Sequence, residues 1–473
     1  MPLLARSVAD LAATPSMRSA MEWFRRERAW INEQHLKLCR IPAPTFFEQK
    51  RAQWMAEQFR SLGWDARIDR AGNVIASLPG TSAGTRDRPA VAVTAHLDTV
   101  LSPRVPEEIK VTGDGCLLGP GVSDNGAGLA ALLALAAVWQ AGPPVPSGSP
   151  VVPNEGVPLV PLLIANVGEE GEGNLSGMRY LCRKAAGARN AGESRAGDLR
   201  AFLVLDGPSV DHITWQALAS RRFDVLFTGP GGHSWSDYGT GNPVHALSRA
   251  VTLFADQVPV VTNVVTSGVA QALACDSTSP DVSSNKTANI PRSSFNFGVI
   301  QGGASINSIP SEARAKVDLR SESPERLEEM VALLGSSVER AVELENTRND
   351  GRSDGRTSGR DGGRAGRTAG PSVGHVTGQV KEIGSRPGGG LQEGAPLLEC
   401  IRAVDVHLGI RSHLDCSSTD ANVPLSLGLP AVSIGAGGQG GGAHTPAEWF
   451  QPERRELGLQ RVLLALCMLL GGE

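Results

Sequence analysis

The sequence predicts an α/β protein in which a mostly parallel sheet carries helices on both faces and a smaller α+β domain is inserted. Four short, continuously apolar runs of strand length, at residues 90–94, 162–167, 201–205 and 431–434, predict the sheet. Helical stretches at residues 128–140 and 175–186 separate the first three runs. Continuous apolar strands that alternate with helices are typical of a parallel sheet covered on both faces.

Residues 19–62, ahead of the first strand, are expected to be helical, with a break at the prolines of residues 41–45.

Bulk properties favour a globular protein without a membrane span. The formal net charge of -4 disfavours nucleic acid as the main partner. No apolar stretch reaches the roughly 20 residues of a membrane span, and residues 1–17 lack an apolar secretion signal. The seven cysteines show no paired spacing, so we expect the reducing cytoplasm and free thiols.

A second pattern begins near residue 219. Residues 220–228 and 314–320 alternate like strands with one solvated face, and helices are expected at residues 243–258 and 323–346. We therefore predict a larger domain of residues 1–217 and 390–473, and a smaller one of residues 218–389. Three segments look like insertions, at residues 141–158, 275–294 and 349–370. The last, rich in Gly and Arg, cannot bury enough surface to offset its ordering entropy, so it is expected to be a solvated loop.

Histidines and carboxylates follow the predicted strands, or precede the helix of residues 128–140. They are His96, Asp98, Asp124, Glu169, Glu170, Asp206 and His444. Because ligands bind at the carboxyl ends of strands in open parallel sheets, we expect these side chains at one edge. Each one alone could simply cap a strand or helix. Together they would repel one another unless a cation neutralised them, and mixed imidazole and carboxylate ligands favour zinc, with cobalt or manganese as alternatives.

The number of ligands predicts two metal ions. The expected ligands are His96, Asp124, Glu170, Asp206 and His444. Asp124 is the expected bridge, because a loop before a helix can approach two ions from the side. Asp98 is expected to fix the second ring nitrogen of His96, and Glu169, next to a ligand, is free to act as a base. Such a site suits amide hydrolysis.

The motifs resemble those of a known family, in the same order along the chain from about residue 41 to residue 450. They are His96-x-Asp98, Gly121-Val-Ser-Asp124-Asn-Gly126, Glu169-Glu170-Gly171 and the late His444. The family is that of the co-catalytic dizinc exopeptidases and amidohydrolases, which includes aminoacylase, succinyl-diaminopimelate desuccinylase, glutamate carboxypeptidase and peptidase T. The chain is closest in style to the peptidase T-like members.

The resemblance implies roles for individual residues. His96, Asp124 and Asp206 would hold one zinc ion, and Asp124, Glu170 and His444 the other. Glu169 would be the general base and acid, with Asp98 orienting His96. The smaller domain would be a lid, which in many members also forms a dimer interface. In that lid, His233 of Gly231-Gly232-His233-Ser234 would stabilise the tetrahedral intermediate. Asn307 and Arg320, in Asn307-Ser-Ile-Pro and Asp318-Leu-Arg320, would anchor the substrate.

These features predict a metallo-exopeptidase for di- or tripeptides, acting as a homodimer. The third acidic ligand is Asp206 rather than Glu, which in this family favours peptidase and aminoacylase members. Hydrolysis of an N-acyl amino acid uses the same machinery and stays open as the alternative. A metal-binding homologue without activity is disfavoured, because the base and all ligands are present. RNA binding by residues 349–370 is disfavoured by interspersed Asp and absent aromatics, and a serine hydrolase by the lack of a Gly-x-Ser-x-Gly motif.

Overall fold

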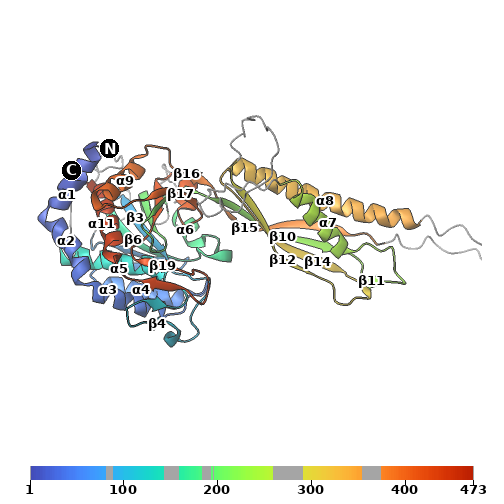
Figure 1. Cartoon of the computed structure of the whole chain (residues 1–473), viewed down its shortest axis with the longest axis horizontal. Helices are drawn as coiled ribbons and strands as arrows, with labels where there is room; N and C mark the ends of the chain where they lie inside the picture. The colour runs from blue at the N-terminus through green and yellow to red at the C-terminus, as the bar shows by residue number, and fades with distance from the viewer. Residues whose placement is uncertain are drawn as a thin grey trace, which may run out of the picture. The chain divides into compact units, whose positions relative to one another are not determined.

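The chain forms two compact units (Figure 1). The computed structural model describes residues 2–80, 89–142, 159–183, 193–194, 197–258, 291–353 and 374–471. The first unit combines Met1–Leu218 with Arg386–Glu473, and the second is Ala219–Ser385. Within the described ranges, none of the helices combines the length and the apolar character that a bilayer crossing demands. The second unit is therefore an insertion into the sequence of the first.

A ten-stranded sheet organises the first unit. Its central strands run parallel in the order β6 (Val160–Asn166), β3 (Ala90–His96), β8 (Gly197–Leu205) and β18 (Ala431–Ile434). These are the four apolar runs of the sequence, and the predicted α/β fold with a mostly parallel core is confirmed. The outer strands are β1 (Asp65–Ile68), β2 (Val74–Ser77), β7 (Glu193–Ser194), β9 (His212–Ala217), β16 (Gly389–Gly390) and β17 (His413–Ser417). Except for β17, which lies parallel to β9, these outer strands make antiparallel pairs.

Helices cover both faces of this sheet. On β3, Val91 and Val93 pack into one apolar core and Ala90 and Ala92 into the other, as the alternation of side chains in a strand requires. The first core is covered by α1 (Pro2–Ala13), α2 (Pro15–Arg26), α3 (Arg28–Cys39), α4 (Gln49–Ser61), α5 (Gly126–Ala141), α9 (Pro396–Leu408) and α11 (Arg455–Gly471). The second is covered by α6 (Ser176–Leu181) and α10 (Asn422–Ser426). A helix predicted to reach residue 186 thus ends at Leu181, and residues 184–192 lie outside the described ranges.

Helix α5 begins where a functional loop ends. Its first fourteen residues are all buried, which explains why its sequence is apolar on every side. The Asn125 side chain caps it by accepting a hydrogen bond from the backbone N of Gly128. A small sheet also joins distant segments of this unit. It contains β4 (Lys110–Val111), β5 (Leu117–Leu118), β19 (Gln439–Gly441) and β20 (Trp449–Gln451).

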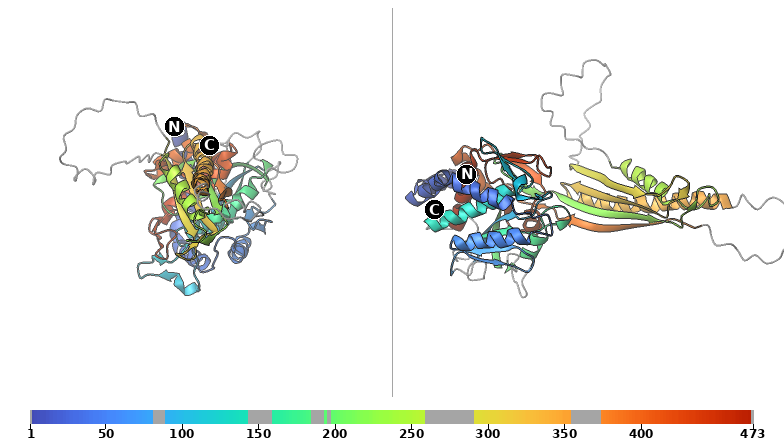
Figure 2. Two further views of the ribbon diagram at one scale, coloured as in Figure 1. Left: turned by 90° about the vertical axis from the view of Figure 1, so that its right-hand side faces the viewer. Right: turned by 90° about the horizontal axis from the view of Figure 1, so that it is seen from below.

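The second unit is a four-stranded sheet with helices on one face (Figures 1 and 2). The strand order is β12 (Ser293–Gly302), β14 (Glu312–Ser321), β10 (Ala219–Thr228) and β15 (Thr377–Arg386). Phe223, Val225 and Phe227 of β10 pack against α7 (Pro243–Ala255) and α8 (Pro324–Ser353). The short strands β11 (Gly232–His233) and β13 (Ser308–Ile309) pair with each other. Helix α8 runs beyond residue 346, so residues 349–353, predicted as loop, are helical; residues 354–370 lie outside the described ranges.

The two chain crossings that lead into and out of the second unit are joined by one side chain of the first unit. Asn422 Nδ2 donates to the carbonyl oxygens of Leu218, at 2.9 Å, and Pro387, at 3.0 Å. Its Oδ1 accepts a hydrogen bond from the backbone N of Thr419 at 2.9 Å. The nitrogen of this buried amide therefore joins the two crossings, and its oxygen binds the backbone near its own helix.

Candidate metal centre

Three adjacent parallel strands bring acids and a histidine to one edge of the sheet. Strand β3 ends at His96, β6 is followed by Glu169 and Glu170, and β8 is followed by Asp206. Since parallel neighbours end at the same edge, the side chains meet there. Asp124 joins them from the loop ahead of α5.

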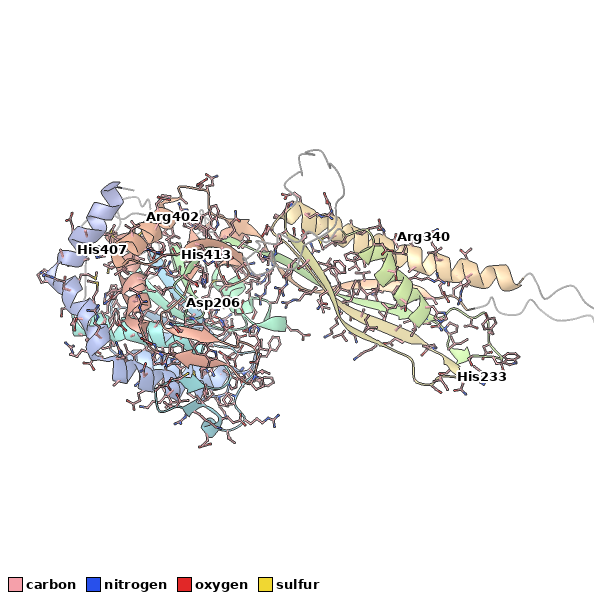
Figure 3. All side chains as sticks on the ribbon, in the orientation of Figure 1. Asp206, His233, Arg340, Arg402, His407 and His413 are labelled. Atoms are coloured by element: carbon pink, nitrogen blue, oxygen red, sulfur yellow. The ribbon has the colours of Figure 1, made fainter. Side chains whose placement is uncertain are left out.

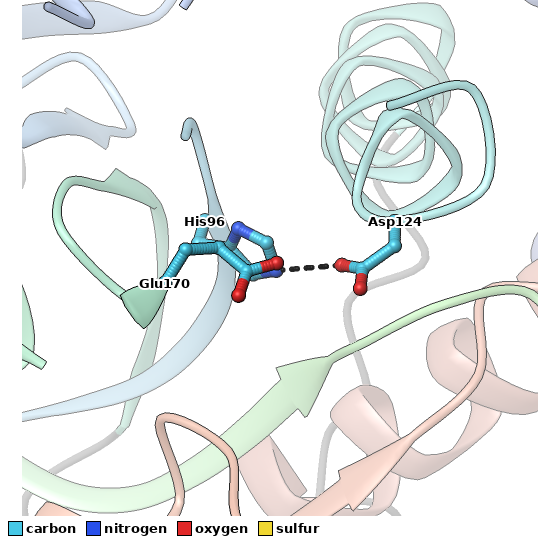
Figure 4. A group of neighbouring side chains, drawn as sticks. All are labelled: His96, Asp124 and Glu170. Atoms are coloured by element: carbon cyan, nitrogen blue, oxygen red, sulfur yellow. Dashed lines mark ion pairs between the residues drawn. The ribbon is translucent and has the colours of Figure 1, made fainter. Parts of the chain in front are cut away.

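One half of the site is built on His96. Its Nε2 lies 3.0 Å from Asp124 Oδ1 and 3.9 Å from Asp206 Oδ1. Figure 4 shows the imidazole and the Asp124 carboxylate facing each other, with Glu170 beside them. His96 Nδ1 lies 2.9 Å from the backbone oxygen of Asp98, to which only a protonated nitrogen can donate. Nε2 of the neutral ring is thereby left as the free donor atom for a metal.

The other half is built on His444, which follows a glycine-rich loop and has a φ of 64°. Its Nε2 lies 3.2 Å from Asp124 Oδ2 and 2.9 Å from Glu170 Oε1. The two oxygens of Asp124 therefore face two different histidines. All five predicted metal ligands are brought together in the arrangement His96–Asp206 on one side of Asp124 and His444–Glu170 on the other.

The donor set fits a divalent cation. Ligand atoms of His96, Asp124 and Glu170 lie within 4.8 Å of one another. Asp124 Oδ1 is buried and accepts no hydrogen bond from the described residues. A metal ion bound by this oxygen would satisfy it. Burial alone would lower the pKa of His96, but the neighbouring carboxylates, chiefly Asp124, raise it well above its usual value. Hydrogen bonds to Asp124 and Glu170 raise the pKa of His444 to about 10. The carboxylates thus demand positive charge at both positions.

Asp98 contacts the second ring nitrogen of His96, as predicted, but the hydrogen bond is made by its backbone oxygen. Its Oδ1 is 3.7 Å from His96 Nδ1, beyond hydrogen-bond range, and it is the Asp98 carbonyl that meets the ring. The Asp98 carboxylate instead accepts the backbone N–H groups of Glu169, at 3.0 Å, and Glu170, at 2.9 Å, together with the Thr45 hydroxyl at 3.0 Å. Asp98 therefore holds the histidine with its backbone and the acidic loop with its side chain.

Glu169 is paired with an arginine that the sequence did not single out. Arg386 Nη1 lies 2.7 Å from Glu169 Oε1, and Nη2 donates to the Glu169 carbonyl oxygen at 2.5 Å. The Ser418 hydroxyl also contacts Arg386, at 3.2 Å. Burial raises the pKa of Glu169 well above its ordinary value, although the Arg386 charge acts to lower it. This contact separates the two adjacent glutamates: Glu169 faces the guanidinium, whereas Glu170 faces His444.

A second buried carboxylate, Asp420, lies near this site. The Asn166 amide at the end of β6 donates to Asp420 Oδ2 at 2.6 Å, while Asp420 Oδ1 has no hydrogen-bond partner among the described residues. Burial raises the pKa of Asp420 to about 7. Asn166 is the last residue of β6, and Asp420 lies two residues before α10. Nothing local in the sequence distinguishes Asn166 from an ordinary strand residue.

The three predicted substrate-contacting residues of the second unit do not gather at one point. His233 is exposed at the end of that unit marked by β11 (Figure 3), and the backbone N of Ser234 donates to the carbonyl oxygen of Asn307 at 2.9 Å. The backbone N–H groups of Trp235 and Ser236 donate to His233 Nδ1, which leaves the proton of the neutral ring on Nε2.

Arg320 lies near the opposite end of β14. It pairs across the sheet with Ser220, whereas Glu312, the first residue of that strand, pairs with Thr228 close to β11. Its Nε donates to Asp318 Oδ2 at 2.6 Å. Arg320 lies eight residue steps along the strand from Glu312, so about 27 Å lies between the His233 end and Arg320.

Comparisons with known proteins agree with this architecture. Residues 219–343 match the peptidase dimerisation domain and residues 73–206 match peptidase family M28, together more than half of the chain. The cytosol non-specific dipeptidase of Escherichia coli (strain K12) is 31% identical over 116 residues, which are 21% of this chain. The chain thus matches only about a quarter (23%) of the length of that curated relative.

Solved structures with the same fold cover nearly the whole chain. A tripeptidase from Staphylococcus aureus shares 18% identity, with a TM-score of 0.64 over 93% of this chain and 98% of the other. The aminopeptidase PepT of Bacillus cereus gives 18% and 0.62 over the same shares. The di-peptidase Dug1p of Saccharomyces cerevisiae gives 12% and 0.60 over 96% and 98%. Residues 73–206 are thus similar to peptidase family M28 and residues 219–343 to the peptidase dimerisation domain, and the chain has the fold of these solved peptidases.

Proposed function

We propose that the protein is a dizinc exopeptidase that releases amino acids from di- and tripeptides. The observation that carries the proposal is the placement of Asp124 between two histidines, 3.0 Å from His96 and 3.2 Å from His444. A carboxylate that offers one oxygen to each of two imidazoles is the arrangement needed to bridge two ions. The names of the dipeptidase relative and of the tripeptidase and PepT structures support peptides as the substrate class.

The proposed ligand sets are His96, Asp124 and Asp206 for one ion, and Asp124, Glu170 and His444 for the other. Two imidazoles with three carboxylates suit zinc, and cobalt or manganese would also be accepted. When bound, the ions would polarise the scissile carbonyl and make a nearby water more acidic. The remaining chemistry falls to residues of the chain.

Glu169 is the proposed general base. Arg386 holds its Oε1 and its carbonyl oxygen, which fixes the carboxylate and leaves Oε2 for the proton of the attacking water. The same group would then deliver the proton to the leaving amine. His233, with its proton on Nε2, is the proposed donor to the developing oxyanion. Arg320 is the proposed anchor for a substrate carboxylate and Asn307 for its polar backbone atoms.

A homodimer would reconcile the positions of His233 and Arg320. About 27 Å of strand separates Glu312, at the His233 end of β14, from Arg320. An extended tripeptide spans only about 10 Å. One copy of the second unit therefore cannot place both residues on a single small substrate. In a dimer, a substrate could meet Arg320 of one chain and His233 of the partner subunit. The match to the peptidase dimerisation domain supports this proposal.

The cytoplasm is the proposed compartment. None of the six described cysteines forms a disulfide bond; they are Cys39, Cys116, Cys182, Cys400, Cys416 and Cys467. Free thiols persist in reducing compartments. The name of the Escherichia coli relative, a cytosol dipeptidase, points the same way.

The test is a substrate panel with the metal-reconstituted full chain. Di- and tripeptides with free amino termini are expected to be cleaved, and N-acetyl amino acids to be left intact. Glu169→Gln should retain the metal content of the wild type and lose about 10²–10⁴-fold in kcat. Glu172→Gln, which changes an exposed glutamate of the same loop, is the matched control and should be fully active. Turnover of N-acetyl amino acids alone would favour the deacylase alternative, and an active Glu169→Gln enzyme would exclude this base.

A further inference from the structure

Three backbone N–H groups of the loop that carries Asp124 converge on a buried carboxylate. Gly121 N donates to Glu448 Oε2 at 2.7 Å, and Ser123 N and Asp124 N donate to Glu448 Oε1 at 2.7 and 2.8 Å. The Glu448 side chain is 2% exposed, so water does not compete for these bonds. Neighbouring N–H groups that point into one concavity form an anion site, and here the anion is part of the chain.

Glu448 also belongs to the segment of His444. Its backbone N donates to the carbonyl oxygen of Thr445 at 3.3 Å, and the backbone N of Gly119 donates to the Glu448 carbonyl oxygen at 2.8 Å. Glu448, four residues after His444, therefore accepts hydrogen bonds from the 119–124 loop with both its side chain and its backbone. A single residue connects the loop of the bridging carboxylate to the loop of the late histidine, across more than 320 residues of sequence.

Other contacts restrain different parts of the same loop. Asn125 Nδ2 donates to the Leu205 carbonyl oxygen at 2.7 Å, directly before Asp206, and the His35 ring meets the Val122 carbonyl oxygen at 2.7 Å. Neither contact involves the backbone N of Asp124. Among the described residues, the acceptor for the Asp124 N–H group is Glu448 Oε1.

The backbone conformation of the loop presents these N–H groups to Glu448. Gly121 has a φ of +77°, and a side chain there would meet the Thr99 methyl group at 2.5 Å. Its N–H is thus presented to Glu448 in a conformation that other residues adopt only with strain. The left-handed Gly121 and the directions of the three N–H groups thus fit the loop to the Glu448 carboxylate.

We propose that Glu448 is a positioning residue of the metal centre: it sets the spacing between the bridging Asp124 and His444, and through it the affinity for the pair of ions. The inference rests on the proposed two-ion site. A carboxylate is required because it accepts all three N–H groups, and bonds to a charged acceptor are the stronger kind. In a glutamine, one of the two oxygens becomes an NH2 group, which cannot accept a hydrogen bond from the N–H group or groups that face it.

The experiment compares Glu448→Gln and Glu448→Asp with the wild type and with Glu453→Gln, an exposed glutamate five residues further on. Each metal-free protein is titrated with zinc by calorimetry, its thermal unfolding is recorded, and the visible spectrum of its cobalt form is measured. Glu448→Gln is expected to fold but to bind zinc about 10–100-fold more weakly, the usual effect of losing a residue that orients metal ligands. Its cobalt spectrum should change, which a loss of fold stability alone would not cause.

The outcomes separate this inference from the proposed function. Zinc affinity and a cobalt spectrum in Glu448→Gln equal to those of the wild type would overturn the role of Glu448 while leaving the two-ion site intact. A wild-type protein that binds no zinc would refute the site itself. If Glu448→Gln does not fold, the Glu448→Asp variant tests the inference. Its side chain is one methylene shorter, so its carboxylate cannot reach the loop N–H groups that Glu448 meets at 2.7–2.8 Å. Wild-type affinity in Glu448→Asp would overturn the inference, and weakened affinity with a normal Glu453→Gln would support it.

Discussion

Replacing Arg386 by Met tests whether its ion pair with Glu169 stabilises the fold and lowers the pKa of Glu169, the proposed general base. Both side chains are almost fully buried, at 7% and 6% exposure, with 2.7 Å between Arg386 Nη1 and Glu169 Oε1. Removing one partner of such a pair leaves the other charge buried and costs about 3–5 kcal/mol of unfolding free energy. The matched control, Arg402→Met, breaks a pair with Glu399 in which the arginine is 31% exposed and the nitrogen–oxygen distance is 3.0 Å. That change should cost at most about 1 kcal/mol.

The cost in Arg386→Met should depend on pH with a defined sign. Burial raises the pKa of Glu169 and the Arg386 charge lowers it, so the variant raises that pKa further. A carboxyl group whose pKa is higher in the folded than in the unfolded state is neutral in both states below its ordinary value of 4.5. The extra destabilisation should therefore be small below that value, grow as the pH rises, and be fully present above the folded pKa. The acid limb of kcat/KM should move to higher pH for the same reason.

Urea unfolding followed by tryptophan fluorescence measures the first unit, because seven of the eight tryptophans belong to it and only Trp235 to the second. The measurement is made at neutral pH and again near pH 4. A loss of less than about 1 kcal/mol at neutral pH, equal to that of Arg402→Met, would refute the buried ion pair. An unchanged acid limb would refute its influence on the base.

Three further predictions follow from the site and from the core. Zinc binding to the metal-free protein should release about two protons at neutral pH, because the pKa values of His96 and His444 are raised and both rings must lose a proton to ligate; calorimetry in buffers of different ionisation enthalpy measures this, and no dependence on the buffer would contradict it. Mixing inactive His233→Ala and Glu169→Gln chains should restore about a quarter of wild-type activity if His233 acts on the partner's site, since half of the dimers are mixed and each has one complete site; no recovery after subunit exchange would contradict action across the dimer. Burial raises the pKa of the Cys39 and Cys400 thiols to about 12, so Ellman's reagent should modify them in urea but not in the native protein, as peptide mapping would reveal.

The sequence predicted the parts of the fold that repeat a local pattern. The central strands are continuously apolar because both faces are buried, and the acids and histidines that follow them stand out by contrast. Strands β9 and β17 gave no such signal, since both are only partly buried and their pairing depends on distant segments. The predicted end of α8 at residue 346 was wrong: the polar composition that follows favours a loop, but the helix continues to Ser353.

The site was predictable where one residue type has one chemical use, and unpredictable where the role depends on a tertiary contact. His96 and His444 were identified as candidate ligands because they end a strand and a glycine-rich loop. Arg386 and Glu448 are common charged residues that become important through partners 217 and 325 residues away. Asp98 was assigned by spacing alone, yet its side chain turns to the backbone of Glu169 and Glu170 rather than to the imidazole. Only three-dimensional geometry decides between such options.

The Asn422 amide has a consequence for how this architecture could arise and be rebuilt. Because one nitrogen donates to the carbonyl oxygens of both Leu218 and Pro387, those two oxygens are no more than about 6 Å apart. Two or three residues, at 3.8 Å between successive Cα atoms, would close that gap. The first unit is thus a nearly continuous chain into which the second has been spliced at a single point. Ancestral insertion, and deliberate exchange of the second unit for another domain, would require only this junction to be preserved.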